Sequence, residues 1–253
     1  MLASGSCGNS ILVSSRNYHF LIDAGLSCRE LLRRLAQAGL SPGDVSAVII
    51  THEHQDHILG VGVLSRRHKI PVYMNAATLD AARSHVGEIP TARVFVTGDA
   101  LIMGDLAVQT YPVPHDASEP IGLSIRNSES RIGIALDMGY PTKLVKHRLS
   151  ESNALVLEFN HEPEMLRQCQ RPWEIKQRIL GKTGHMSNEA ALELLCGLVH
   201  DQLRTVVLAH ISREANSAQH ALSMVKTRLE SIGRADVGVF VGDQDTIGER
   251  IEV

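Results

Sequence analysis

Short apolar runs alternate along this chain with stretches whose hydrophobic residues recur at helical spacing. A short apolar run bounded by turn residues is typical of a strand, and a repeat every three to four residues is typical of an amphipathic helix. In the first half, the pattern predicts helices at 28–38, 60–68 and 76–85. It predicts strands at 10–14, 18–23, 45–51, 71–74, 93–96, 105–111, 122–127 and 131–137.

The second half continues the same alternation. Helices are expected at 141–149, on both sides of Pro172, at 188–199 with Ser187 as the cap, and at 215–232. Strands are expected at 154–159, 205–209, 237–241 and 247–251. The turns Ser15-Arg16-Asn17 and Ser128-Glu129-Ser130 would join two hairpins. Strands mixed with outer helices favour an α/β layered architecture. Because no Pro-, Gly- or Ser-rich break interrupts the pattern, we expect residues 1–253 to form a single domain.

Composition describes a globular chain of 253 residues, with 43% hydrophobic residues and a mean hydropathy of -0.03. No apolar run approaches the roughly 18 residues of a membrane helix, and the N-terminus lacks signal-peptide features. The four cysteines have no CxxC spacing, so we expect reduced thiols and a cytoplasmic protein. A formal net charge of -3 argues against a global basic field, so any polyanion site must be local.

The most informative segment is Thr51-His52-Glu53-His54-Gln55-Asp56-His57, directly after the apolar run 45–50. It places three imidazoles and a carboxylate behind a predicted buried strand. Nitrogen and oxygen donors of this kind suit zinc, manganese or iron, and their density suggests more than one metal ion. A histidine-rich surface turn is the alternative. The full His-x-His-x-Asp-His spacing favours the metal site.

Four further donors each lie at or just beyond the end of an apolar run, where loops commonly build sites. They are Asp23, His115, Asp137 and His210. Taken singly, such an aspartate is more often a turn or cap residue, and such a histidine is more often only hydrogen-bonded. Their occurrence together with the histidine run favours a shared metal centre.

The segments LIDAG, THEHQDH, ALDMG and LAHIS, with the His115 loop, resemble the metallo-β-lactamase fold superfamily over nearly the whole chain. The resemblance implies a four-layer αββα sandwich that holds two divalent ions, zinc or manganese, with iron as an alternative. It implies His52, His54 and His115 on the first ion, and Asp56, His57 and His210 on the second, with Asp137 bridging. Asp23 would orient the metal-binding loop without binding metal itself. No cysteine occupies a ligand position, which disfavours the cysteine-containing antibiotic-hydrolysing site.

Three other segments resemble the YycJ/WalJ group of bacterial metallo-β-lactamase-fold exonucleases. They are SGSCGNS at the start of the chain, LEFNHE at 157–162 and GHMSN at 184–188. Cys7, Gln55, Glu162 and Met186 depart from the group's pattern, and none of them is an expected ligand. The resemblance implies degradation of duplex DNA from a 5′ end, in repair.

The resulting mechanistic hypothesis is attack on a phosphodiester by a metal-bridging hydroxide that Asp56 helps to hold. By analogy with tRNA-processing RNase Z, His185 would protonate the leaving oxygen and Glu158 would orient His185. Phosphate contacts are expected from the polar side chains of the three segments, namely Ser6, Asn9, Asn160, His161 and Ser187. The basic stretch from Arg167 to Lys182 is either a guide for the phosphate backbone or a solvated helix face.

Other functions fit the same donors. An RNase Z-like ribonuclease would act on RNA, although no exosite insertion typical of that enzyme is apparent. A small-molecule cyclic phosphodiesterase would show no dependence on DNA length. A thioester hydrolase would leave GHMSN without a role, and a catalytically weak nucleic-acid-binding protein would be expected to have lost ligands. The aromatic content of 4% favours a duplex backbone over splayed single-stranded bases as the ligand.

Overall fold

The computed structural model describes residues 1–16 and 18–253, so Asn17, in the predicted turn Ser15-Arg16-Asn17, lies outside the described residues. The chain groups into two compact units that alternate along the sequence. The first unit contains Met1–Thr110, Ala117–Ile121 and Asp243–Arg250. The second contains Tyr111–Asp116, Gly122–Gly242 and Ile251–Val253. The expectation of a single domain stays a prediction.

The first unit is built on a five-stranded sheet in the order β1-β2-β3-β4-β5. Its strands are β1 (Ile11–Ser15), β2 (Tyr18–Ile22), β3 (Val45–Ile49), β4 (Val72–Asn75) and β5 (Ala92–Phe95). Only the β1–β2 pair is antiparallel among the described strands of this sheet. Parallel neighbours leave the carboxyl ends of β2, β3 and β4 at one edge, which places the residues that follow these strands close together.

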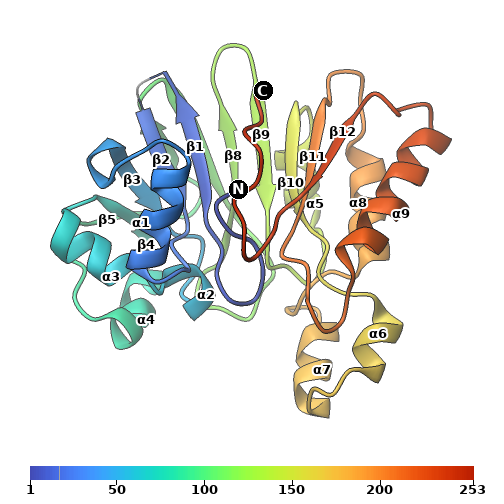
Figure 1. Ribbon diagram of the computed structural model, residues 1–253, viewed down its shortest axis with the longest axis horizontal. Coiled ribbons are helices and arrows are strands. Elements are labelled where there is room, and N and C mark those ends of the chain that lie inside the picture. The colour runs from blue at the N-terminus through green and yellow to red at the C-terminus, as the bar shows by residue number, and fades with distance from the viewer. Residues whose placement is uncertain (17) are drawn as a thin grey trace. The chain divides into compact units, whose positions relative to one another are not determined.

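Helices cover this sheet with their apolar sides (Figure 1). They are α1 (Cys28–Gln37), α3 (Val61–Val63), the π-helical segment η2 (Leu64–His68) and α4 (Ala76–Val86). Ser27 begins α1 by accepting a hydrogen bond from the Glu30 N–H, and Leu31 and Leu35 then fall on its buried side. The unit also contains η1 (Pro42–Asp44), α2 (Gln55–Ile58), β6 (Ala100–Met103) and most of β7 (Leu106–Pro112).

The second unit contains β8 (Ile121–Arg126) apart from its first residue, and the strands β9 (Arg131–Ala135), β10 (Ala154–Glu158), β11 (Thr205–Ala209) and β12 (Gly238–Val241). The strands from β9 to β12 run parallel, and every residue of β10 and β11 is buried. Side chains of α5 (Lys143–Leu149), α8 (Asn188–Leu198) and α9 (Ala218–Ser231) pack in the same core. The short helices α6 (Pro163–Gln168) and α7 (Trp173–Leu180) form a separate pair with a small core of their own (Figure 1).

Most predicted elements are confirmed, and three differences matter. The sequence pattern did not predict α2, because a helix of four residues is too short to show an apolar repeat, and it did not predict the strand β6. The strand predicted at 247–251 is wrong, since the structure has loop there. The Asp243 carboxylate accepts hydrogen bonds from the N–H groups of Asp245 and Thr246, which makes a turn, and the Gly248 N–H donates to the Met1 carbonyl.

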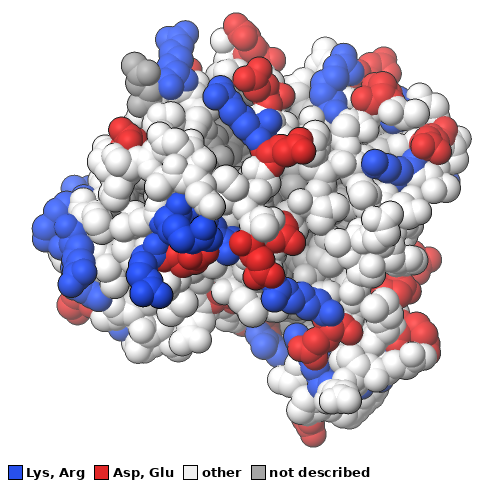
Figure 2. Space-filling model, viewed as in Figure 1, with Lys and Arg blue, Asp and Glu red and all other residues white. Residues whose placement is uncertain are grey.

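Surface and composition agree with a mixed-charge protein. On the face drawn in Figure 2, basic and acidic side chains of the described residues are interspersed. Among the described residues, no helix is both long and apolar enough to cross a membrane. All four cysteines are free, as predicted, while the predicted cytoplasmic location stays a prediction.

Candidate metal centre

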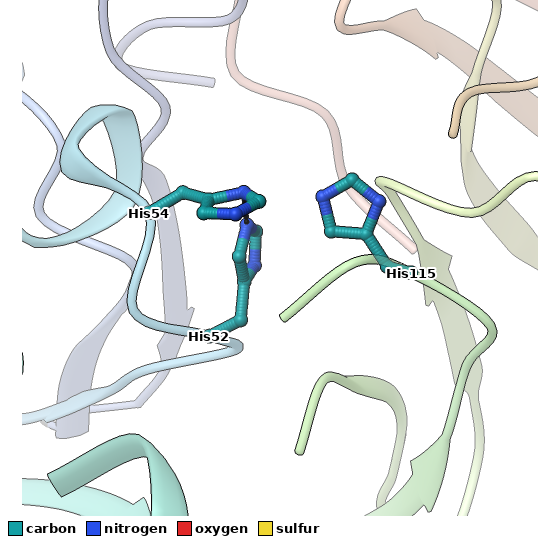
Figure 3. A group of neighbouring side chains, drawn as sticks. All are labelled: His52, His54 and His115. Carbon is teal, nitrogen blue, oxygen red and sulfur yellow. Dashed lines mark hydrogen bonds between the residues drawn. The ribbon is translucent and has the colours of Figure 1, made fainter. Parts of the chain in front are cut away.

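The first unit gathers its candidate ligands on residues 51–57, which we call the histidine loop. The loop follows β3 and leads into α2, whose N-cap is His54. His52 and His54 lie edge to face, with 3.0 Å between His52 Nε2 and His54 Nδ1 (Figure 3). The His52 and His57 ring centroids are 4.1 Å apart. Three imidazoles of the predicted set are therefore brought together within this unit.

Asp23 ties the two ends of the histidine loop together. It follows β2, and its Oδ1 accepts the Thr51 N–H at 2.8 Å. Its Oδ2 accepts the Thr51 hydroxyl at 2.9 Å and lies 2.7 Å from His57 Nδ1. A carboxylate on Nδ1 leaves Nε2 of a fully buried His57 as the atom that can bind metal.

Asn9 and Asp56 meet at the other side of the same loop. The Asn9 N–H donates to the Asp56 carbonyl at 2.7 Å, and Asn9 Nδ2 lies 3.2 Å from Asp56 Oδ2. The same Nδ2 lies 3.1 Å from His57 Nε2. Gly25 makes this approach possible, because a Cβ there would lie 1.6 Å from the Asp56 carbonyl oxygen. Asp56 and His57 are thus held from the backbone and from a neighbouring side chain.

Glu53, which is not among the expected ligands, also anchors this loop. Its Oε1 accepts both the N–H and the hydroxyl of Ser118 at 2.7 Å. Ser118 lies three residues beyond the His115 position in the sequence. Its Ser-Glu-Pro context gave no sign of this pairing, because the partners are 65 residues apart.

The second unit gathers four side chains from the ends of three parallel strands and one loop. Asp137 follows β9, Glu158 ends β10 and His210 follows β11, while His185 precedes α8. One ligand atom from each of these four residues lies within 4.8 Å of the others. Asp137 Oδ1 contacts His210 Nδ1, and it lies 3.3 Å from His185 Nδ1. Carboxylate and imidazole donors at this spacing suit a divalent transition metal.

Glu158 is completely buried and is bonded on both oxygens. Its Oε1 lies 2.6 Å from His185 Nδ1. Its Oε2 accepts the Met138 N–H at 3.0 Å and the Met186 N–H at 3.3 Å. Glu158 therefore fixes the backbone just after Asp137 and just after His185, as well as the His185 ring. The contacts match those of a group that orients another, rather than those of a metal ligand.

The same carboxylates control the charge of the buried histidines. Burial alone would lower the pKa of His185, but Glu158 and Asp137 outweigh it and raise this pKa to about 10. Burial would likewise lower the pKa of His210, and Asp137 raises it above its usual value. For His161, burial outweighs the influence of Glu158 and lowers the pKa to about 4. His185 is therefore the ring of this group best suited to carry a proton.

His115 stands on the loop after β7 (Figure 3). Its Nδ1 lies 3.1 Å from the Gly184 carbonyl, which fixes Nδ1–H as the donor and leaves Nε2 for a ligand. Its ring centroid lies 5.1 Å from that of His185. The following residue, Asp116, accepts both Arg178 Nε and Arg178 Nη2, and its N–H donates to the Thr183 carbonyl at 3.0 Å.

Three candidate residues adopt a left-handed backbone conformation. The φ angles are +61° at Asp23, +49° at Asp137 and +52° at His210. Asp23 and His210 come directly after their strands and Asp137 comes two residues after β9, so the chain turns sharply at the candidate residue itself. Such conformations cost non-glycine residues roughly 1–3 kcal/mol, and they concentrate at functional sites.

The predicted phosphate contacts divide into two groups. Asn9, Asn160 and Ser187 are already committed within the protein: Asn160 Nδ2 donates to the His210 carbonyl at 3.0 Å, and Ser187 Oγ accepts the Ala190 N–H. Each of these side chains keeps further hydrogen-bonding capacity, so their phosphate contacts stay predictions. Ser6 is exposed, and among the described residues buried His161 Nδ1 has no hydrogen-bond partner, so both stay candidates.

The basic stretch from Arg167 to Lys182 is also largely engaged within the protein. Arg171 pairs with Glu214 at 3.1 Å, and Arg178 pairs with Asp116. Lys176 Nζ donates to the Arg167 carbonyl and is buried. The prediction that the basic stretch guides a phosphate backbone therefore rests mainly on the exposed Lys182.

Comparisons with known proteins place this site in a family. The model of the beta-lactamase superfamily domain matches residues 18–211. The chain is 39% identical to exodeoxyribonuclease YycJ of Bacillus anthracis, over 92% of this chain and 89% of that protein. It is 33% identical to exodeoxyribonuclease WalJ of Streptococcus pneumoniae, over 95% of this chain and 90% of that protein.

The solved structures agree on the fold. The metallo-beta-lactamase fold protein YhfI from Bacillus subtilis matches with a TM-score of 0.73 and 16% identity, covering 96% of this chain and 94% of that one. The predicted α/β metallo-β-lactamase fold class is confirmed. This chain belongs to the metallo-β-lactamase superfamily and, within it, to the group of YycJ and WalJ.

Proposed function

We propose that this protein is a metal-dependent exodeoxyribonuclease that degrades duplex DNA from a 5′ end. The observation that carries the proposal is the Glu158–His185 pair beside Asp137, a proton donor next to a candidate metal ligand. Family membership and the names of the two relatives supply the substrate class. Hydrolysis of a phosphodiester needs a proton donor as well as the metal, because the leaving oxygen must be protonated as the bond breaks.

The donor sets of the two units fit a pair of divalent ions. Within the first unit, His52 Nε2 lies 3.0 Å from His54 Nδ1. Within the second, one ligand atom from each of Asp137, Glu158, His185 and His210 lies within 4.8 Å of the others. We assign ligands by membership of the superfamily, in which both sets serve one centre. The first ion would be held by His52, His54 and His115, the second by Asp56, His57 and His210, with Asp137 shared. Imidazole and carboxylate favour zinc or manganese, with iron as an alternative.

The ions would supply an activated water and positive charge beside the phosphate. The protein's own residues do the rest. Asp23 holds His57 in the tautomer that offers Nε2, and Asp56 helps to hold the attacking water. His185 keeps its proton through neutral pH because Glu158 and Asp137 raise its pKa, so it can deliver that proton to the leaving oxygen.

The test is hydrolysis of one sequence presented in several forms. End-labelled duplex DNA, single-stranded DNA, RNA and a cyclic phosphodiester are incubated with protein loaded with manganese or with zinc. We expect the 3′-labelled strand of duplex DNA to release mononucleotides from its 5′ end. That strand should become progressively shorter and keep its label until last. A metal-free His54→Ala variant is the control for a contaminating nuclease. Preferential cleavage of RNA or of the cyclic phosphodiester would replace the proposed substrate, and no cleavage of any polynucleotide would refute the nuclease assignment.

A further inference from the structure

The segment after β12 has no part in the proposed chemistry, yet it closes over the N-terminal loop Ser4–Ser10. Gln244 lies in this segment and is only 8% exposed. Its Oε1 accepts the Cys7 N–H at 2.8 Å, and its Nε2 donates to the Gly8 carbonyl at 2.9 Å. Gly5 packs on the same carboxamide, since a Cβ there would lie 2.6 Å from Oε1. The Gln244 side chain therefore fixes the conformation of the N-terminal loop.

A buried arginine fixes Gln244 in place. Arg34, on α1, is 4% exposed, and its Nη1 donates to the Gln244 carbonyl at 2.9 Å and to the Leu2 carbonyl at 2.8 Å. The Ser4 N–H donates to the Asp243 carbonyl at 3.0 Å. Segments from the two ends of the chain are thus anchored side by side within the first unit.

The loop shaped in this way delivers Asn9 to the candidate ligands. Asn9 Oδ1 accepts the Gly5 N–H at 2.9 Å, which fixes the orientation of the carboxamide. Asn9 Nδ2 then faces only acceptors: the Gly5 carbonyl at 3.1 Å, Asp56 Oδ2 at 3.2 Å and His57 Nε2 at 3.1 Å. An acceptor-rich position of this kind needs an N–H₂ group. The lone pair of His57 Nε2 is the one that would bind metal, so the Asn9 contact that can persist in a metal-loaded site is the one to Asp56 Oδ2.

We propose that Gln244 and Asn9 act in series as positioning residues for Asp56, and so set the affinity of the metal ion that Asp56 would hold. The inference rests on the proposed metal centre. Partners that orient metal ligands typically change metal affinity by about 10- to 100-fold when they are removed. Gln244 acts only through the N-terminal loop, so its effect requires Asn9.

The experiment is a calorimetric titration of metal-free protein with Mn²⁺. Manganese is chosen because the exposed thiol of Cys7 would bind zinc. The variants are Asn9→Ala, Gln244→Ala, their combination, and Gln244→Glu, which keeps the acceptor for Cys7 but loses the donor to Gly8. Gln37→Ala, an exposed glutamine at the end of α1, is the matched control. Urea unfolding of each metal-free variant separates loss of affinity from loss of fold.

We expect two Mn²⁺ sites in the wild type. Asn9→Ala should weaken one of them by about tenfold or more and leave the other nearly unchanged. Gln244→Ala should weaken the same site less, and the double variant should bind as Asn9→Ala does. If Asn9→Ala fails to fold, the smaller loss at one site in Gln244→Glu carries the test.

Three results would overturn the inference: unchanged affinity at both sites in Asn9→Ala, equal weakening of both sites in Gln244→Ala, or additive losses in the double variant. If Gln244→Glu must carry the test, two unchanged affinities overturn it as well. A wild-type protein that binds no Mn²⁺ would instead refute the metal centre of the proposed function, and the wild-type titration alone reveals that result.

Discussion

Replacing Glu158 with glutamine tests the proton donor most directly. The carboxylate lies 2.6 Å from His185 Nδ1 in a fully buried position. Hydrogen bonds to charged groups contribute about 1.5 to 3 kcal/mol. Since about 1.4 kcal/mol is a factor of ten in rate, Glu158→Gln should lower the single-turnover rate by roughly 10- to 150-fold. The carboxamide oxygen of the substituted side chain could still accept the Met138 and Met186 N–H groups, so the fold should be retained.

The proton-donor role of His185 also predicts the direction in which activity changes with pH. His185 can act as an acid only while it is protonated, and the neighbouring carboxylates raise its pKa to about 10. Activity should therefore fall as pH rises through that pKa. Without the charge of Glu158 the pKa of His185 drops, so the alkaline limb of the rate profile should move to lower pH in Glu158→Gln.

The assay is single-turnover cleavage of end-labelled duplex DNA by metal-saturated protein whose metal content has been measured. His185→Ala alone should lose about a hundred- to ten-thousandfold in rate. In the His185→Ala background, Glu158→Gln should cost little more, because Glu158 acts through the ring that is gone. Glu164→Gln, an exposed glutamate on α6, is the matched control and should leave the rate unchanged. An equal loss from Glu158→Gln with and without His185 would refute the reasoning.

Three further outcomes are expected. His54→Ala and Asp56→Asn should each lose bound metal together with hydrolysis, and full activity with full metal content by elemental analysis would contradict the ligand assignment. Gly25→Ala should fail to fold or lose several kcal/mol in urea unfolding, because its Cβ would lie 1.6 Å from the Asp56 carbonyl oxygen, so wild-type stability would be incompatible with the packing. Arg178→Ala should lower the free energy of unfolding by no more than about 1 kcal/mol, because its pair with Asp116 is half exposed, and a much larger loss would mean that the pair is not a surface ion pair.

Strand-end residues were the most predictable part of the site. Asp23, Asp137 and His210 each follow an apolar run in the sequence, and each follows the corresponding strand in the structure. Parallel strands bring the residues that follow them to one edge of their sheet, as they do for Asp137 and His210, so residues far apart in the sequence become neighbours in space. The pairing of Glu158 with His185 could be predicted only by analogy, because neither segment contains a signal for the other.

The hydrogen-bond partners of individual side chains were much less predictable. Asn9 and Asn160 occur in polar segments that suit phosphate, but their amides bond to Asp56 and to the His210 carbonyl, 47 and 50 residues away. Gln244 gave no signal at all, because its partners Cys7 and Gly8 lie at the other end of the chain. A local pattern records which groups can form hydrogen bonds, whereas the tertiary fold decides which partners they meet.

The backbone at the candidate ligands shows why stability and site geometry oppose each other here. Six non-glycine residues in the described part of the chain have a positive φ, and Asp23, Asp137 and His210 are three of them. Glycine would adopt this conformation without strain, but it could neither clamp the histidine loop nor contact a metal. Aspartate and histidine tolerate the left-handed region better than branched residues do, so they can end a strand and turn it at one position. Each turn costs roughly 1–3 kcal/mol, and the buried bonds of Asp23 to Thr51 and His57 show how the surrounding structure holds such a residue in place.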